Sequence, residues 1–283
     1  MARETPWQAA QRRAANVRRV EERRAGYRAS AHEESFMKKL RAAQRSLQSF
    51  QRGLDTWKSS LRHRRSDDGR LESFYVLATS PIPEEVDSDL ASCVESLRSA
   101  LDQLVYALSQ RAAGPLTREQ ERLTAFPIWR IAPHSNDARA WRALSLLSDK
   151  ARSSIQKLQP YSAFPSEPSA SPLWLLTELS ERSKHRENLV SAAAIGVDEL
   201  KIGNGYIDEF LGGGGRIVPG EELLVLARSR RNRADMNWSV SLRYILDAPG
   251  TAGDRRDPTT VLAELVQYVD AVVIERLLPR LWD

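Results

Sequence analysis

Apolar residues recur at alternating steps of four and three through the first part of the chain. This heptad pattern predicts one long amphipathic helix over residues 32–62 and a second over residues 86–111. Helices with matching apolar stripes bury them against each other, so we expect the two to pack as an antiparallel pair. The stripe positions are Phe36, Leu40, Ala43, Leu47, Phe50, Leu54, Trp57 and Leu61 in the first helix, and Leu90, Val94, Leu97, Leu101, Leu104 and Leu108 in the second.

Two more helices are predicted in the middle of the chain. One covers residues 136–159 and stops at a proline, and the other covers residues 172–188 and begins with a proline. The segment TAFPIW, residues 124–129, precedes them, and we expect its apolar cluster to dock onto the helices. A short strand is predicted over residues 71–79, between the first two helices.

The hydrophobic period changes from that of a helix to that of a strand after residue 189. Alternating apolar and polar positions, separated by Gly, Asn and Pro turns, predict a sheet over residues 189–246. A final helix over residues 259–279 places Leu262, Leu265, Val269, Val272 and Leu277 on one face. The order predicts an α+β fold, with a long-helix antiparallel bundle followed by a small antiparallel sheet and a C-terminal helix.

Within this fold class, residues 31–283 are expected to form a single domain, mainly helical over residues 31–188. Residues 1–30, the N-terminal arm, contain eight arginines and three glutamates and too few large apolar residues for a core. The net charge of +5 therefore belongs to the arm, which is expected to be flexible or a frayed helix. It is either a plain solvated extension or a contact to the phosphates of RNA or other nucleic acid. The candidate contacts are Arg12, Arg13, Arg18, Arg19, Arg23 and Arg24.

The chain contains a single cysteine, Cys93, beside the apolar stripe of the second helix. It cannot form an intramolecular disulfide, and we expect a small buried thiol. No window resembles a membrane span or a secretion signal, so a cytoplasmic protein without a membrane partner is expected.

Common catalytic and metal-binding motifs are missing from the sequence. The four glycines at residues 212–215 precede neither a lysine nor a helix start, so they indicate a hairpin tip rather than a phosphate loop. The four histidines and one cysteine lack the spacing of known metal sites, and we expect no metal or cofactor.

Two helical edges carry unusual sets of polar residues. Glu95, Arg98, Asp102 and Tyr106 share an edge of the second helix, and the fourth helix has a similar edge around His185. If the edges meet, they form an interhelical polar network or an active site that cleaves a phosphodiester; otherwise they are ordinary surface pairs. The candidate catalytic residues are Arg98, Asp102, Glu181, His185 and Arg186.

The strings LRSALDQLVYAL, FPIW, IQKLQPY and PLWLLTELSERSKHREN occur in this order. Together they resemble a family of uncharacterised bacterial proteins, over about residues 33–283. The resemblance implies a shared fold and emphasises Arg98, Asp102, Lys184, His185 and Arg186.

The string RSALDQ is also similar to the signature of HEPN domains, in which a histidine follows an arginine after four to six residues. That similarity implies a helical RNA-directed nuclease or a degenerate relative, but residue 103 is glutamine, which exchanges no proton near neutral pH. His185 would have to replace the missing base. We therefore expect a non-catalytic interaction or structural module, which could assemble as a homodimer through its helices, with the HEPN-like nuclease as the alternative.

Overall fold

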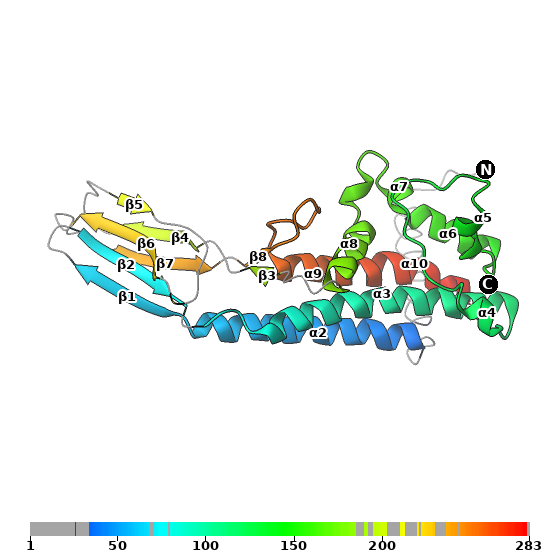
Figure 1. Cartoon of the computed structure of the whole chain (residues 1–283), viewed down its shortest axis with the longest axis horizontal. Helices are drawn as coiled ribbons and strands as arrows, with labels where there is room; N and C mark the ends of the chain where they lie inside the picture. The colour runs from blue at the N-terminus through cyan, green and yellow to red at the C-terminus, as the bar shows by residue number, and fades with distance from the viewer. Residues whose placement is uncertain are drawn as a thin grey trace, which may run out of the picture. The chain divides into compact units, whose positions relative to one another are not determined.

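The structure is a computed structural model of the chain, in which helices make up most of the described part (Figure 1). It describes Gly26, Gly220 and residues 34–67, 71–78, 80–184, 190–191, 195–202, 210–212, 222–229, 236–242 and 244–281. The N-terminal arm, apart from Gly26, lies outside the described residues, as do His185 and Arg186. The predictions about them stay predictions.

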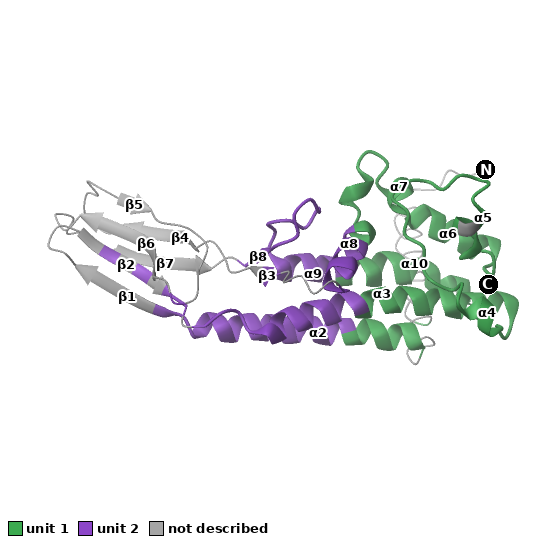
Figure 2. Cartoon of the chain, in the orientation of Figure 1, with its two compact units in different colours: residues 1–42, 96–174, 266–283 green, residues 43–95, 175–265 purple. Residues whose placement is uncertain are grey.

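The chain divides into two compact units (Figure 2). Unit 1 consists of Met1–Ala42, Ser96–Trp174 and Val266–Asp283, and unit 2 of Ala43–Glu95 and Leu175–Leu265. The long helices contribute residues to both units.

The first two predicted helices are present as α2, Ser35–Ser59, and α3, Glu84–Ala113. They run antiparallel, since Glu34 at the start of α2 pairs with Arg111 near the end of α3, at 3.4 Å. Gly53, near the end of α2, approaches Val86 near the start of α3.

The predicted apolar stripes form the core between these helices. All six positions predicted on α3 are buried, as are six of the eight on α2. Leu47 is half-buried, and Leu61 lies beyond the end of its helix. Cys93 is buried, as expected. The periodicity therefore predicted both helices and their buried faces.

The first helix ends three residues earlier than predicted. The hydroxyls of Ser59 and Ser60 donate to the carbonyls of Thr56 and Trp57, both at 2.7 Å. Such side-chain bonds occupy the carbonyls that a continuing helix would use. The strand β1, Arg62–Asp67, follows directly.

The predicted helix over residues 136–159 is wrong, because two shorter helices take its place. These are α5, Ala138–Arg142, and α6, Asp149–Leu158. The Ser148 hydroxyl accepts a hydrogen bond from the main-chain N–H of Ala151 and so begins a new helix. The short elements around them are α4, Arg118–Glu121; α7, Pro160–Ala163; and η1, Pro168–Ala170. The fourth predicted helix is α8, Pro172–Lys184.

The C-terminal helix is not a uniform α-helix, as predicted over residues 259–279. It consists of α9, Pro258–Gln267; η2, a π-helix over Tyr268–Ile274; α10, Glu275–Leu277; and η3, a 3₁₀ turn over Leu278–Leu281. A π-helix has a wider turn, so it shifts the apolar face along the sequence. Val272, predicted to face the core, is 38% exposed, whereas the next residue, Val273, is fully buried.

The described strands pair in three antiparallel ladders. The largest has the order β1-β2-β6-β5, with β2 at Leu71–Leu77, β5 at Phe210–Gly212 and β6 at Glu222–Ser229. The other two pair β3, Val190–Ser191, with β8, Ile245–Leu246, and β4, Ile195–Ile202, with β7, Met236–Leu242.

The pairing differs from the predicted sheet over residues 189–246. Strand β2 comes from earlier in the chain and pairs with β6, placing Leu77 opposite Glu222 and Leu71 opposite Ser229. The difference arises because strand partners depend on tertiary contacts, which the alternation of apolar and polar residues does not specify. Of the glycines at residues 212–215, the structure describes Gly212 alone, as the last residue of β5.

Candidate functional site

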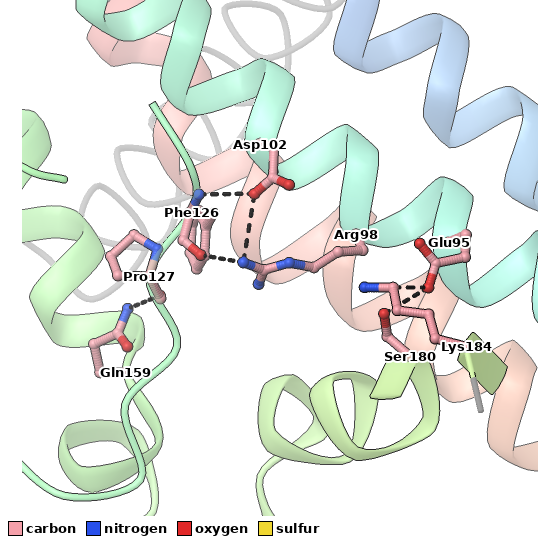
Figure 3. Close-up of polar contacts among 8 residues, drawn as sticks. All are labelled: Glu95, Arg98, Asp102, Phe126, Pro127, Gln159, Ser180 and Lys184. Atoms are coloured by element: carbon pink, nitrogen blue, oxygen red, sulfur yellow. Dashed lines mark hydrogen bonds and ion pairs between the residues drawn. The ribbon is translucent and has the colours of Figure 1, made fainter. Parts of the chain in front are cut away.

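Arg98 and Asp102 on α3 hold the main chain of Phe126 from both sides (Figure 3). The Arg98 Nη2 donates to the Phe126 carbonyl at 2.7 Å, and the Phe126 N–H donates to the Asp102 Oδ1 at 2.8 Å. The two side chains are also 3.5 Å from each other. They are 24% and 37% exposed, so the group is sheltered without being fully buried. The pair thus joins a helix to a loop.

The local sequence explains why this pair meets the loop. Residues four apart on a helix lie on the same face, so Arg98 and Asp102 present a donor and an acceptor side by side. Phe126 lies outside regular secondary structure and is fully buried. Its main-chain N–H and C=O need partners, because burying them unpaired is unfavourable. The charged pair supplies both.

Gln159 holds the next residues of the same loop in a similar way. Its Nε2 donates to the Pro127 carbonyl at 2.9 Å, and its Oε1 accepts from the Trp129 N–H at 2.9 Å. The side chain is fully buried and also donates to the Ile155 carbonyl at 3.2 Å. We call Arg98, Asp102 and Gln159 the loop clamp, since together they bind the main chain of residues 126–129.

A second polar cluster joins α3 to α8 within unit 2. The Ser180 hydroxyl donates to the Glu95 Oε1 at 2.6 Å, and the Lys184 Nζ is 3.9 Å from the same oxygen (Figure 3). Ser180 is 3% exposed, whereas Lys184 and Glu95 are considerably more open. The predicted contact between these two helices is therefore made through Glu95.

The remaining candidates on α8 are not brought into this cluster by any contact among the described residues. Glu181 is exposed. Arg182 donates instead to the Pro249 carbonyl, at 2.7 Å. His185 and Arg186 lie outside the described residues, so their proposed meeting with Arg98 stays a prediction.

An open depression of about 410 Å³ lies beside the loop clamp. The Tyr106 hydroxyl in it donates to the Glu121 Oε1 at 3.3 Å and accepts from Gln110 at 2.8 Å. Partial burial and the nearby Glu121 carboxylate both raise the pKa of Tyr106, so this phenol keeps its proton at neutral pH. The lining residues that the structure describes are Asp102, Gln103, Tyr106, Glu121, Arg122, Thr124 and Ala125.

Hydrogen bonding suits this depression better than proton transfer. Gln103 does not titrate, Tyr106 stays protonated, and the Asp102 carboxylate already accepts the bond from the loop. The described lining contains no histidine. In this part of the chain, the residues that resemble a nuclease signature serve the architecture of the loop.

Metal and thiol chemistry find little support among the described residues. No group of three or more His, Cys, Asp or Glu side chains lies close enough there to hold a metal ion. Burial raises the pKa of the Cys93 thiol to about 12, which keeps it protonated and unreactive. No helix in the described part is both long and apolar enough to cross a bilayer.

Sequence reasoning missed two residues that prove important for these contacts. Gln159 is a polar residue at the end of an apolar helical face, directly before a proline, and that position was a usable signal. Ser180 has no such signal, because small hydroxyl residues are common on helices. Its role follows only from its distance to Glu95.

Comparison of the chain with protein-family models, with curated proteins and with solved structures gave no match in any of the three.

Proposed function

We propose that the protein is a non-catalytic interaction or structural module built on its long helices. The observation that carries the proposal is the hydrogen bonding of Phe126, whose N–H and C=O are both bound by the Arg98/Asp102 pair. A guanidinium bound to a main-chain carbonyl, and a carboxylate bound to a main-chain N–H, are typical of a structural role. The charged edge of α3 thereby fixes a loop against the helix.

The proposal includes the fold class. It is an α+β chain in which the long helices form an antiparallel bundle and the antiparallel strands form a small sheet. The helices supply the rigid part, because their apolar stripes are buried along most of their length.

The alternative hypothesis, a HEPN-like RNA-directed nuclease or a degenerate relative, has weaker support. It requires Arg98 to leave the Phe126 carbonyl and His185 to act as the proton carrier in place of Gln103. Releasing Arg98 would leave a buried carbonyl without its partner, which is unfavourable by about 1–3 kcal/mol.

Activity and stability assays on the same variants separate the two hypotheses. The full chain, Arg98→Ala and His185→Ala are incubated with labelled RNA, and each is unfolded thermally. We expect no cleavage by any of them and a lower Tm for Arg98→Ala, by several degrees. Cleavage by the full chain that either substitution abolishes would overturn the proposal.

Arg111→Ala is the matched control for stability. This arginine lies on the same helix, but it pairs with Glu34 in an exposed ion pair rather than with a buried loop. Such pairs contribute little, about 0–1 kcal/mol. A Tm loss in Arg111→Ala equal to that in Arg98→Ala would mean that the loop contact has no special role.

A further inference from the structure

A second open depression, of about 500 Å³, lies in unit 1 between α6 and the C-terminal turn η3. Helix α6 contributes residues from positions 149–157, and η3 contributes Arg280. The described lining residues are Asp149, Lys150, Ser153, Ser154, Lys157 and Arg280. None of them belongs to the loop clamp.

The spacing of the α6 residues directs their side chains to one edge of the helix. Lys150, Ser153 and Lys157 follow one another at steps of three and four, so they form a single row. Lys150 and Lys157 are exposed, and Ser153 is half-buried. Two ammonium groups therefore flank a hydroxyl along the wall of the depression.

Arg280 brings a third positive charge from a different element. Its Nε donates to the Ser154 hydroxyl at 3.3 Å, and Ser154 itself is buried on the inner side of α6. This bond orients the guanidinium against the wall of the depression. A cation held by a neighbouring side chain loses less conformational freedom on binding a ligand than a free one does.

One negative charge, that of Asp149, lies at the same depression. Its carboxylate is 97% exposed and pairs with Arg152 at 3.5 Å. The charge of Asp149 is therefore screened by water and balanced by its partner. The three cations dominate the potential in the depression.

We propose that this depression binds a ligand bearing an oligophosphate group. Three converging cations match a chain of several negative charges better than a single carboxylate, and the Ser153 hydroxyl can donate a hydrogen bond to a phosphate oxygen. The site is open, so it admits either a free oligophosphate or the phosphate tail of a nucleotide. This inference goes beyond the proposed function and does not depend on it.

Calorimetric titration of the full chain with inorganic tripolyphosphate and, separately, with ATP tests the proposal. The test variant is Lys150→Gln/Lys157→Gln. Its charge-matched control is Lys39→Gln/Lys58→Gln, which removes two exposed lysines of α2 outside the depression. All titrations are repeated on a chain with the six candidate arm arginines changed to Gln, so that binding by the N-terminal arm is removed.

In that background, we expect the test variant to bind at least one of the two probes about tenfold more weakly than its parent. The control should stay within about twofold of the parent. Tighter binding of ATP than of tripolyphosphate would assign the ligand to the nucleotides, and the reverse order would assign it to free oligophosphates. Equal weakening in the test variant and the control, or no saturable binding of either probe below about 1 mM, would overturn the proposal.

Asp149→Asn supplies a change of opposite sign that a misfolded variant could not mimic. Removing the one carboxylate at the depression should strengthen binding by about twofold. Weaker binding in Asp149→Asn would contradict the charge argument. RNA cleavage is a separate readout, so failure here leaves the proposed function intact.

Discussion

At the residue scale, the contacts of Arg98, Asp102 and Gln159 share one feature. Each side chain binds main-chain atoms of the loop, rather than the side chains that distinguish one loop residue from another. The loop has few hydrogen bonds of its own to regular structure, and the loop clamp replaces them. Gln159 is the most buried of the three and therefore the most sensitive to change.

Replacing Gln159 with leucine should destabilise the fold strongly. The change keeps the volume similar but leaves the Pro127 carbonyl and the Trp129 N–H buried without their partner. We expect a loss of about 2–4 kcal/mol in the free energy of unfolding. Thermal unfolding followed by circular dichroism measures it, as a Tm lower by several degrees.

Gln156→Leu is the control for this change, since it makes the same substitution one turn earlier on α6. Gln156 is only half-buried, so its replacement should alter stability by less than about 1 kcal/mol. Similar losses in both variants would argue against a special role for Gln159.

The buried Cys93 should make stability fall at alkaline pH. Burial raises the pKa of its thiol from 9.0 to about 12, so between these values the folded chain keeps a proton that the unfolded chain has lost. Stability is therefore fully present below pH 9 and declines above it, by at most about 1.4 kcal/mol per pH unit.

Urea unfolding at a series of pH values from about 8 to 10 measures this decline. Below pH 10, the tyrosines with raised pKa values add little to it. Cys93→Ala should be less stable at every pH because of the lost methyl-sized volume, but its stability should fall less steeply. Identical slopes in the two proteins would contradict the buried thiol.

The residues of the core could be predicted from the sequence, whereas the partner of Arg98 could not. The apolar stripe repeats locally, so its period shows which residues face inward. Phe126 lies 28 residues from Arg98, and the bonded atoms belong to the main chain. Every residue except proline carries the same N–H and C=O, so no side-chain pattern marks such a contact.

At the element scale, the errors in prediction came from hydrogen-bonding signals that compete with periodicity. The apolar face over residues 136–159 continues in sequence, yet Ser148 caps a new helix and interrupts it. The C-terminal face is displaced by one residue, because the π-helix changes the number of residues per turn. Periodicity thus located helices well and their internal breaks poorly.

Gly53 permits the closest approach between α2 and α3. A Cβ atom added there would lie 2.9 Å from the Cγ2 of Val86, closer than two carbon atoms can pack. Gly53→Ala should therefore lower the free energy of unfolding by about 1–3 kcal/mol, even though alanine favours a helix by about 1 kcal/mol. Urea unfolding provides the measurement.

A double-substitution cycle identifies the cause. In a Val86→Ala background the obstructing methyl is gone, so adding Gly53→Ala should be neutral or stabilising. If Gly53→Ala destabilised both backgrounds equally, the loss would not come from contact with Val86.

At the scale of the whole molecule, the positive charge is unevenly distributed along the sequence. The arm carries the full net charge of +5, and the rest of the chain has equal numbers of basic and acidic residues. Nucleic-acid binding by the arm and dimer formation through the helices both stay predictions. Among the described residues, only Ile131 and Val272 are large apolar side chains with substantial exposure. This limits the apolar area on that part of the surface.

Changing the six candidate arm arginines to glutamine should weaken RNA binding at low salt. The substitutions remove phosphate contacts without shortening the chain, so affinity should fall by at least about tenfold and become less dependent on salt. Fluorescence anisotropy with labelled RNA at several salt concentrations measures both effects. Unchanged affinity at low salt would leave the arm as a plain solvated extension.

The loop clamp also limits how the chain can change in length. Its two grips lie at residue 126 and at residues 127 and 129, so the interval between them is fixed by the positions of α3 and α6. Adding or deleting a residue inside FPIW would detach one grip, whereas the stretch ahead of it has no such fixed spacing to keep. Among natural or engineered variants, length differences should accumulate between residues 114 and 123 and stop abruptly at Phe126.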